Sequence, residues 1–256
     1  MEQMKKEIRA AERSWKEVFS VEKPFCEHLH RWQDEVLYDM YDHNQFVPIG
    51  EDSQIECVTK DELEAAFAYQ KEQGWDFLKL DSREKLDSSL VHAFGLEECE
   101  IYTMLLPEKE LTNWKTNEKV VIKDIKTNDI EKDIKDLEIK NYASIYGLDF
   151  TERKMDYYLR KAKETEGFHY LAAYLDGKIA GTCYVFAKHG YVVMDSLIVN
   201  EEVRKQYVAT TLMKYIAEHF DEKMFLHADA DDTPKDMYAK MGFTVVDSLF
   251  EYCKTW

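Results

Sequence analysis

From residue 119 onward, the hydrophobic residues switch between a period of two and a period of about 3.6 in a definite order. The order predicts one strand, two helices, three strands, a helix, a strand, a helix and a final strand. Asp176-Gly177 separates the apolar runs 168–175 and 178–187, and this pair is a strong hairpin signal. Lys188-His189-Gly190 leads in the same way into the strand predicted at 191–199. Strands and helices interleaved in this order predict an α/β chain built on a mixed sheet.

The first half is expected to contain fewer elements of the same kinds. The pattern predicts a charged helix at 1–19 and two strands at 25–32 and 35–46. A helix at 59–74, a strand at 75–82, a helix at 88–96 and a strand at 97–107 follow.

Two stretches of the chain share an order of elements. The strand, helix, glycine and strand of 75–107 recur at nearly the same spacing in 223–252. We interpret this as a weak internal repeat; the alternative is two α/β segments that resemble each other by chance.

A polar segment without periodicity, residues 108–119, is the candidate linker between the halves. We therefore expect two domains, at 1–115 and 116–256. A chain of 256 residues with 45% hydrophobic residues is long and apolar enough for two cores.

The charge excludes some classes of partner. The formal net charge is -17, whereas neutralising nucleic-acid phosphates requires a surplus of Lys and Arg. The same charge disfavours binding to an anionic membrane surface.

The cysteines and the N-terminus indicate a cytoplasmic protein. Five cysteines are scattered without a C-x-x-C pair, which is typical of free thiols in a reducing compartment. The first residues are charged throughout, so no signal peptide is expected, and no stretch is apolar enough to cross a membrane.

The stretch VNEEVRKQYVATTL, residues 199–212, joins a predicted strand to a predicted helix. The first N–H groups of a helix have no partner within it and lie at the positive end of its dipole. Such a terminus binds phosphate, and Arg204 and Lys205 add positive charge. The alternatives are a solvated basic pair and a junction that only begins a helix.

These residues resemble a known motif. Arg204 to Ala209 is similar to the Q/R-x-x-G-x-G/A loop of the GCN5-related N-acetyltransferase (GNAT) family, and Tyr238 to Phe243 is similar to its Y-x-x-x-G-F motif. The resemblance covers roughly residues 118–256. It implies a GNAT-like fold, with a degenerate partial copy in the first half, and transfer of an acetyl group from acetyl-CoA to a primary amine.

The resemblance also implies which residues bind the cofactor. The strand end would hold the pantetheine arm, the loop would hold the pyrophosphate, and Asp231 stands where many relatives have an asparagine. The expected cofactor-binding residues are Leu197, Ile198, Val199, Arg204, Lys205, Gln206, Tyr207, Val208, Ala209, Thr210 and Asp231. Tyr207 replaces the family's first glycine, and binding is expected to survive if Tyr207 takes ordinary helical angles.

For catalysis, the resemblance assigns Tyr238 as the acid that protonates the CoA sulfur. A backbone N–H near Ile198 or Val199 would polarise the carbonyl. Asp195 is the candidate base, acting through water, and Ser196 is a weaker one; a solvated Asp195 is the alternative. Four residues are expected on the acceptor side: Tyr146, Asp149, Tyr157 and Tyr158.

Two other patterns are interpreted without a metal. Cys26-x-His28-x-His30 indicates one face of a polar strand, and the acidic run Asp229 to Asp232 indicates a helix start. We expect no metal.

The predicted function is an acetyl-CoA-dependent N-acetyltransferase whose amine acceptor is a small molecule or a peptide. The alternatives are a non-catalytic CoA- or metabolite-binding module and an interaction scaffold. The first half lacks the phosphate loop, and Val91 or His92 stands where Tyr238 stands in the second half. It is therefore expected to be non-catalytic, with a structural role, a part in the acceptor site or a contact in a possible homodimer.

Overall fold

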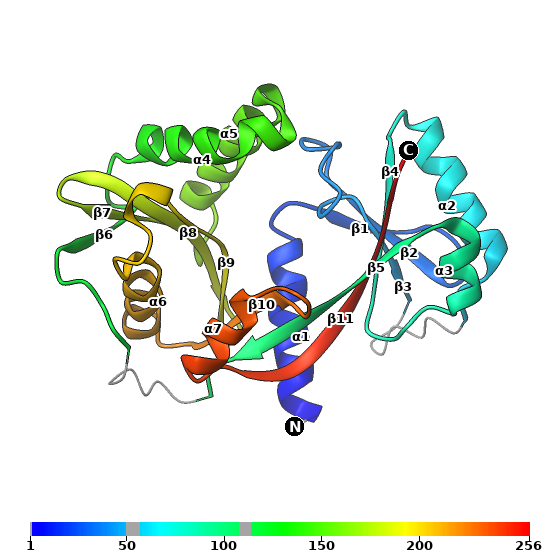
Figure 1. Cartoon of the computed structure of the whole chain (residues 1–256). Helices are drawn as coiled ribbons and strands as arrows, with labels where there is room; N and C mark the ends of the chain where they lie inside the picture. The colour runs from blue at the N-terminus through cyan, green and yellow to red at the C-terminus, as the bar shows by residue number, and fades with distance from the viewer. Residues whose placement is uncertain (1, 50–56, 108–113) are drawn as a thin grey trace. The chain divides into compact units, whose positions relative to one another are not determined.

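The computed structural model describes residues 2–49, 57–107 and 114–256 (Figure 1). The chain divides into two compact units, and each unit takes segments from both halves of the sequence. Unit 1 comprises Met1–Trp15, Met104–His227 and Met237–Thr244, and unit 2 comprises Lys16–Thr103, Ala228–Asp236 and Val245–Trp256.

Unit 1 is built on the strand order β10-β9-β8-β7-β6. Its strands are β6 (Val120–Asp124), β7 (Phe168–Leu175), β8 (Lys178–Lys188), β9 (Tyr191–Val199) and β10 (Lys223–Asp229). Its helices are α1 (Glu2–Lys16), α4 (Glu131–Tyr146), α5 (Leu148–Glu164), the 3₁₀ turn η2 (Glu201–Val203), α6 (Val208–His219) and most of α7 (Pro234–Lys240). The strands from β6 to β9 are antiparallel neighbours, and β10 joins β9 in parallel.

Helices cover both faces of this sheet. The pair α4 and α5 lies on one face and α6 lies on the other (Figure 1). The α4–α5 face is rich in buried aromatic rings: Trp15 of α1 contacts Phe168 and Tyr184, with ring centroids 4.8 and 5.3 Å apart. Burial of such rings is the largest apolar contribution to this core.

Unit 2 has the strand order β1-β2-β3-β4-β11-β5. Its strands are β1 (Val21–Pro24), β2 (Leu29–Gln33), β3 (Phe46–Pro48), β4 (Phe77–Ser82), most of β5 (Glu97–Leu105) and most of β11 (Thr244–Thr255). Its helices are α2 (Lys60–Glu72) and α3 (Ser88–Phe94). Strand β11 pairs antiparallel with β4 over six residues, from Phe250 opposite Ser82 to Thr255 opposite Phe77.

The two faces of the β4–β11 pair differ in chemistry. On one face, Leu78, Leu80 and Tyr252 are fully buried in the apolar core under α2 and α3. On the other face stand Lys79, Asp81 and Glu251, because alternate residues of a strand point to opposite sides.

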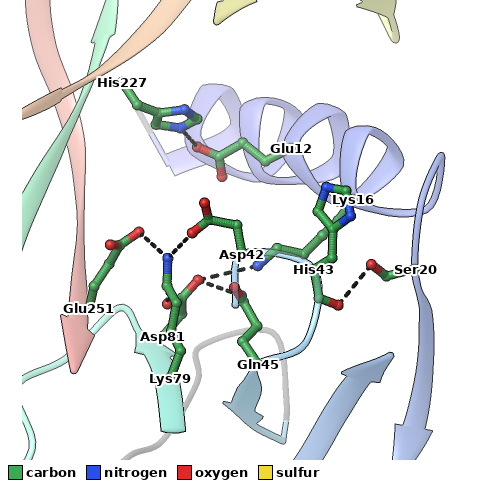
Figure 2. Close-up of polar contacts among 10 residues, drawn as sticks. All are labelled: Glu12, Lys16, Ser20, Asp42, His43, Gln45, Lys79, Asp81, His227 and Glu251. Atoms are coloured by element: carbon green, nitrogen blue, oxygen red, sulfur yellow. Dashed lines mark hydrogen bonds and ion pairs between the residues drawn. The ribbon is translucent and has the colours of Figure 1, made fainter. Parts of the chain in front are cut away.

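Buried Lys79 is the centre of the polar cluster on that second face (Figure 2). Its Nζ lies 2.6 Å from Asp42 Oδ1, 2.9 Å from Glu251 Oε1 and 3.8 Å from Asp81 Oδ1. Burial would lower the pKa of Lys79, but the three carboxylates raise it well above the ordinary value. Lys79 therefore remains an ammonium that neutralises carboxylates inside the unit.

The structure corrects one predicted element of the first half. Residues 35–46 were expected to form a strand, but β3 begins only at Phe46 and the preceding residues form turns. Asp34 Oδ1 accepts the N–H groups of Val36 and Leu37, while Asn44 Nδ2 donates to the carbonyls of Leu37 and Met40. These side-chain bonds satisfy the backbone locally, so the segment does not pair with a neighbouring strand.

Candidate active site

The first part of the site is a bulge in β9. In the β8–β9 register, Thr182 faces Ile198 and Tyr184 faces Asp195, so Cys183 alone stands opposite two residues, Ser196 and Leu197. Ser196 has a φ of 52°, which is uncommon for a residue other than glycine. Such a bulge redirects the following residues of the strand.

Beyond the bulge, β9 separates from its parallel neighbour. The β9–β10 pairing covers only Tyr191–Met194 against Lys223–Leu226, in the described part of both strands. On its other side, Asn200 N donates to the carbonyl of Ala180 in β8. Since the amides of a strand alternate between its two sides, the N–H of Val199 points away from β8, toward the side that β10 leaves open.

The strand then leads into the N-terminus of α6. The first helical residue is Val208, and no side chain caps the helix. Among the described residues, no acceptor is assigned to the N–H groups of Val208, Ala209 and Thr210, because the first intrahelical bond runs from Thr211 N to Tyr207 O. Three free donors at a positive helix end form an anion-binding arrangement.

The condition set for binding at this loop, that Tyr207 takes ordinary helical angles, is not met. Its φ is 60° and its ψ is 23°, in the left-handed region, and its side chain is 46% exposed. Lys205, two residues earlier, also has a positive φ of 65°. The chain thus makes the turn of the glycine-containing loop with a tyrosine in the left-handed conformation.

Two residues of the predicted linker, 108–119, contact the junction between β9 and α6. Lys115 O accepts from Thr210 Oγ1 at 2.6 Å, and Asn117 Nδ2 donates to Gln206 O at 3.1 Å. Residues 108–113 of the predicted linker lie outside the described residues. Arg204 is exposed and paired with Glu201 at 3.2 Å, so part of the loop's positive charge is already balanced.

Tyr238 lies in α7 and is the first residue of the Y-x-x-x-G-F motif. Gly242 has a φ of 98° and lets the chain turn after the helix, so that Phe243 N bonds to Tyr238 O and the two rings lie 5.9 Å apart. Tyr238 is buried, and burial, the charge of Asp195 and Cys183 raise the pKa of its phenol. Tyr238 is therefore fully protonated at neutral pH, as a proton donor must be.

Asp195 is exposed at the start of the bulge. Its Oδ1 accepts the N–H of Ser196 at 2.6 Å. Burial is the first cause that raises the pKa of the half-buried Tyr142 and the buried Tyr184 and Tyr238, and the negative charge of Asp195 adds to it in all three. The structure thus brings the two predicted catalytic residues, Asp195 and Tyr238, into one electrostatic neighbourhood.

The other predicted residues are distributed unevenly. Tyr146 and Asp149 are exposed around the α4–α5 turn, while Tyr157 and Tyr158 are buried. Asp231 follows β10 within unit 2, where its N–H donates to Asp229 Oδ1 at 2.7 Å. Its contact with pantetheine stays a prediction.

Sequence reasoning missed a set of buried groups beneath the bulge. Burial and the charge of Glu138 are the first causes that raise the pKa of Tyr142 to about 12, and Tyr142 also bonds to Ser196. Glu138 is buried, accepting from Tyr170 at 2.7 Å and Thr182 at 3.1 Å, and burial raises the pKa of its carboxyl. The only sequence signal for Glu138 is an acid on the apolar side of a helix.

The residues considered for metal have other partners. His28 lies 3.2 Å from Glu62, and His30 lies 2.7 Å from Glu22. Within residues 2–49, 57–107 and 114–256, no group of three or more His, Cys, Asp or Glu side chains is arranged to hold a metal ion. In the same ranges, no helix combines the length and the apolar character that crossing a bilayer requires.

Comparison with known proteins agrees with this geometry. Residues 133–243 match the family model of the acetyltransferase (GNAT) family, so this part of the chain is a GNAT domain. The match spans β9, α6 and the Tyr238 motif. No curated protein shows significant sequence similarity to the chain.

Solved structures show the same fold over most of the chain. A functionally unknown conserved protein from Staphylococcus epidermidis has a TM-score of 0.75 at 16% identity, covering 93% of this chain and 95% of that chain. A GCN5-related N-acetyltransferase from Kribbella flavida has a TM-score of 0.63 at 12% identity, covering 97% and 95%. A tandem GNAT protein from the clavulanic acid biosynthesis pathway has a TM-score of 0.53 at 13% identity, covering 89% and 82%. These folds agree with a mixed sheet and with a second GNAT-like domain in the N-terminal half of the chain.

Proposed function

We propose that the protein is an acetyl-CoA-dependent N-acetyltransferase that acts on a primary amine. The GNAT domain at 133–243 supports an acyltransferase type of function. The observation that carries the proposal is the pair of donor sites at the two ends of this segment, the edge of β9 that β10 leaves unpaired and the uncapped start of α6, together with the charge of Asp195 acting on Tyr238.

Binding follows from these two donor sites. The edge of Leu197, Ile198 and Val199 would pair with the amides of the pantetheine arm in the manner of an added strand. The N–H groups of Val208, Ala209 and Thr210 would bind the pyrophosphate, and Arg204, Lys205 and Gln206 would border it. The pantetheine contact of Asp231 belongs to the same proposal.

The chemistry requires a neutral amine, a polarised carbonyl and a proton for the departing sulfur. The amine nitrogen forms a bond to the thioester carbon, and the carbon–sulfur bond breaks. Asp195 receives the amine proton through water, Tyr238 gives its phenolic proton to the sulfur, and a backbone N–H of the β9 edge polarises the carbonyl oxygen. The catalytic residues all belong to the proposed domain 116–256, and the domain 1–115 is proposed to be non-catalytic.

The acceptor is proposed to be a small molecule or a peptide that enters beside the α4–α5 turn. Tyr146 and Asp149 are exposed there, whereas Tyr157 and Tyr158 are buried further along α5.

A second candidate function is a non-catalytic module that binds CoA or a related metabolite. The left-handed, exposed Tyr207 favours this candidate, because it places a large ring where the family's loop has no side chain.

A thermal-shift titration with acetyl-CoA tests binding first. Ligand at about 100 times its dissociation constant stabilises a protein by roughly 2.7 kcal/mol, and each kcal/mol moves the midpoint by about 2 to 4 °C at this size. Release of free CoA thiol in the presence of a panel of amines then tests turnover. A shift without turnover would favour the binding module, and the absence of a shift would defeat both candidates.

A further inference from the structure

Tyr184 is the direct cross-strand neighbour of Asp195. The β8–β9 register pairs the two residues, so their side chains stand on the same face of the sheet, the face that α4 and α5 cover. Tyr184 is only 6% exposed, so its hydroxyl is buried on the same face of the sheet as the Asp195 carboxylate. Burial and the charge of Asp195 raise the pKa of Tyr184 well above the ordinary value, so the hydroxyl is a permanent donor.

Asp195 in turn holds the backbone of the bulge. Its Oδ1 accepts the N–H of Ser196, which has a positive φ that a residue with a side chain rarely adopts. A left-handed residue persists in a strand only where its surroundings fix it. The bond from Ser196 N to Asp195 is one such constraint.

We propose that Tyr184 is a positioning residue for acetyl transfer: it fixes Asp195, Asp195 fixes Ser196 in the left-handed conformation, and the resulting bulge aims the β9 amides at the thioester carbonyl. This inference rests on the proposed function. Nothing in the resemblance or the comparisons assigns a role to Tyr184.

Among the groups affected by the charge of Asp195, Tyr184 has a distinct position. After burial, the charge of Asp195 raises the pKa of four groups: Tyr142 in α4, Cys183 and Tyr184 in β8, and Tyr238 in α7. Tyr184 differs from the others in being the register partner of Asp195. By fixing Asp195, it also fixes the position of that carboxylate relative to the acid Tyr238.

A purely structural role for Tyr184 can be separated from the positioning role. Its ring packs against Trp15, Tyr158 and Tyr170, with ring centroids 5.3, 5.4 and 5.6 Å from its own. Tyr184→Phe keeps this ring and removes only the hydroxyl. Tyr170→Phe is the matched control, because it removes a buried hydroxyl from the adjacent strand, where the partner is Glu138 rather than Asp195.

Steady-state kinetics of the full chain provide the first test. We expect Tyr184→Phe to lower kcat by about 10-fold, with the KM for acetyl-CoA unchanged, because misaligned donors weaken the transition state rather than cofactor binding. Asp195→Ala should lower kcat by about 100-fold. Asp195→Asn should lose less than Asp195→Ala, since an amide oxygen still accepts the Ser196 N–H. An unchanged kcat in Tyr184→Phe, or an equal loss in Tyr170→Phe, would overturn the inference.

A second measurement does not depend on turnover. Hydrogen exchange of the Ser196 amide, followed by NMR, should become about 10-fold faster in Tyr184→Phe and faster still in Asp195→Ala, with Tyr170→Phe like the wild type. Unchanged exchange in Tyr184→Phe would reject the contact chain at any level of activity. If the wild type acetylates no amine, the proposed function is wrong, and the catalytic role of Tyr184 is wrong with it. The hydrogen-exchange rates still show whether Tyr184 fixes the bulge.

Discussion

The two halves of the chain each contain a helix between two parallel strands, and the two helix starts are opposite in character. In unit 2, α2 begins after β3 with a capping box: Thr59 Oγ1 accepts Glu62 N, and Glu62 Oε2 accepts Thr59 N. In unit 1, α6 begins after β9 with no side-chain cap and no acid in its first turn.

The consequence is a difference in what each helix end can bind. Glu62 also accepts the N–H of His28 at 2.9 Å, so one buried carboxylate occupies the positive end of α2. An incoming phosphate would meet this negative charge and find its donors already used. At α6 the donors are free and the flanking residues are Arg204 and Lys205. The Glu62 side chain thus accounts for the difference: it caps the start of α2, whereas the start of α6 has no such side chain and keeps its donors available to a ligand.

The largest expected effect concerns catalysis, because the proposed proton donor, Tyr238, lies in the second half. Tyr238→Phe should lower kcat by about 100-fold or more with little change in acetyl-CoA affinity, because general acids contribute roughly 10²–10⁴-fold. His92→Phe, at the corresponding helix of the first half, is the control and should leave kcat unchanged. Measured thiol release and a thermal-shift titration separate the two parameters. Equal turnover in Tyr238→Phe and wild type would remove Tyr238 from the mechanism.

The next effect contrasts corresponding strand positions, Lys79 in the FLKL of β4 and His227 in the FLHA of β10. Lys79→Met should lower the free energy of unfolding by about 3–5 kcal/mol, because the buried Asp81 and the partly buried Glu251 lose their counter-charge. His227→Met breaks only a partly exposed pair with Glu12, 2.8 Å away, and should cost about 0–1 kcal/mol. Urea denaturation measures both.

The pH dependence of the Lys79→Met variant has a definite sign. Without the ammonium, folding raises the pKa of the remaining carboxyls, so the deficit is largest at neutral pH and shrinks as the pH falls and they bind protons. A deficit that grows on acidification would contradict the role assigned to Lys79.

A smaller effect is expected from opening the α2 cap. Thr59→Ala should cost about 1 kcal/mol of stability, and Glu62→Gln a similar amount at pH 7. Burial raises the pKa of Glu62, but the bonds from Thr59 and His28 outweigh this and lower it below the ordinary 4.5. The stabilisation is therefore complete above pH 4.5 and is lost as the pH falls through the lowered folded-state value. Thermal denaturation of both variants from pH 7 to pH 3 checks this, and a Glu62→Gln deficit that persists at pH 3 would refute it.

The smallest effect concerns the loop of α6. Tyr207→Gly should stabilise the protein by about 1 kcal/mol, because glycine has no penalty in the left-handed conformation. Tyr207→Ala is the matched control: it removes the same ring but keeps the penalty, and it should not stabilise. If acetyl-CoA affinity is the same in both variants and the wild type, the ring takes no part in binding; if both variants lose affinity equally, it contributes to the site.

Much of unit 1 could be predicted because periodicity and turn residues agree there. Asp176-Gly177 joins β7 to β8 as expected, and the strand at 191–199 coincides with β9. The GNAT resemblance is confirmed by the family match at 133–243. The assigned roles of the site residues stay predictions.

The remaining features depend on contacts that a pattern does not contain. The turns of residues 35–45 follow from the side chains of Asp34 and Asn44, and a tyrosine at position 207 gives no sign that its φ is positive. The bulge at Ser196 and the buried Glu138 likewise become visible only when distant strands and helices are brought together.

The pairing of β11 with β4 affects the order in which the two units can fold during translation. Ser82 has left the ribosome long before its partner Phe250 is made, so the sheet of unit 2 stays incomplete while most of the chain emerges. Because β4 and β11 are separated by about 170 residues, we expect unit 2 to complete its folding after unit 1. Each unit takes segments from both halves of the sequence, so neither half contains a complete unit.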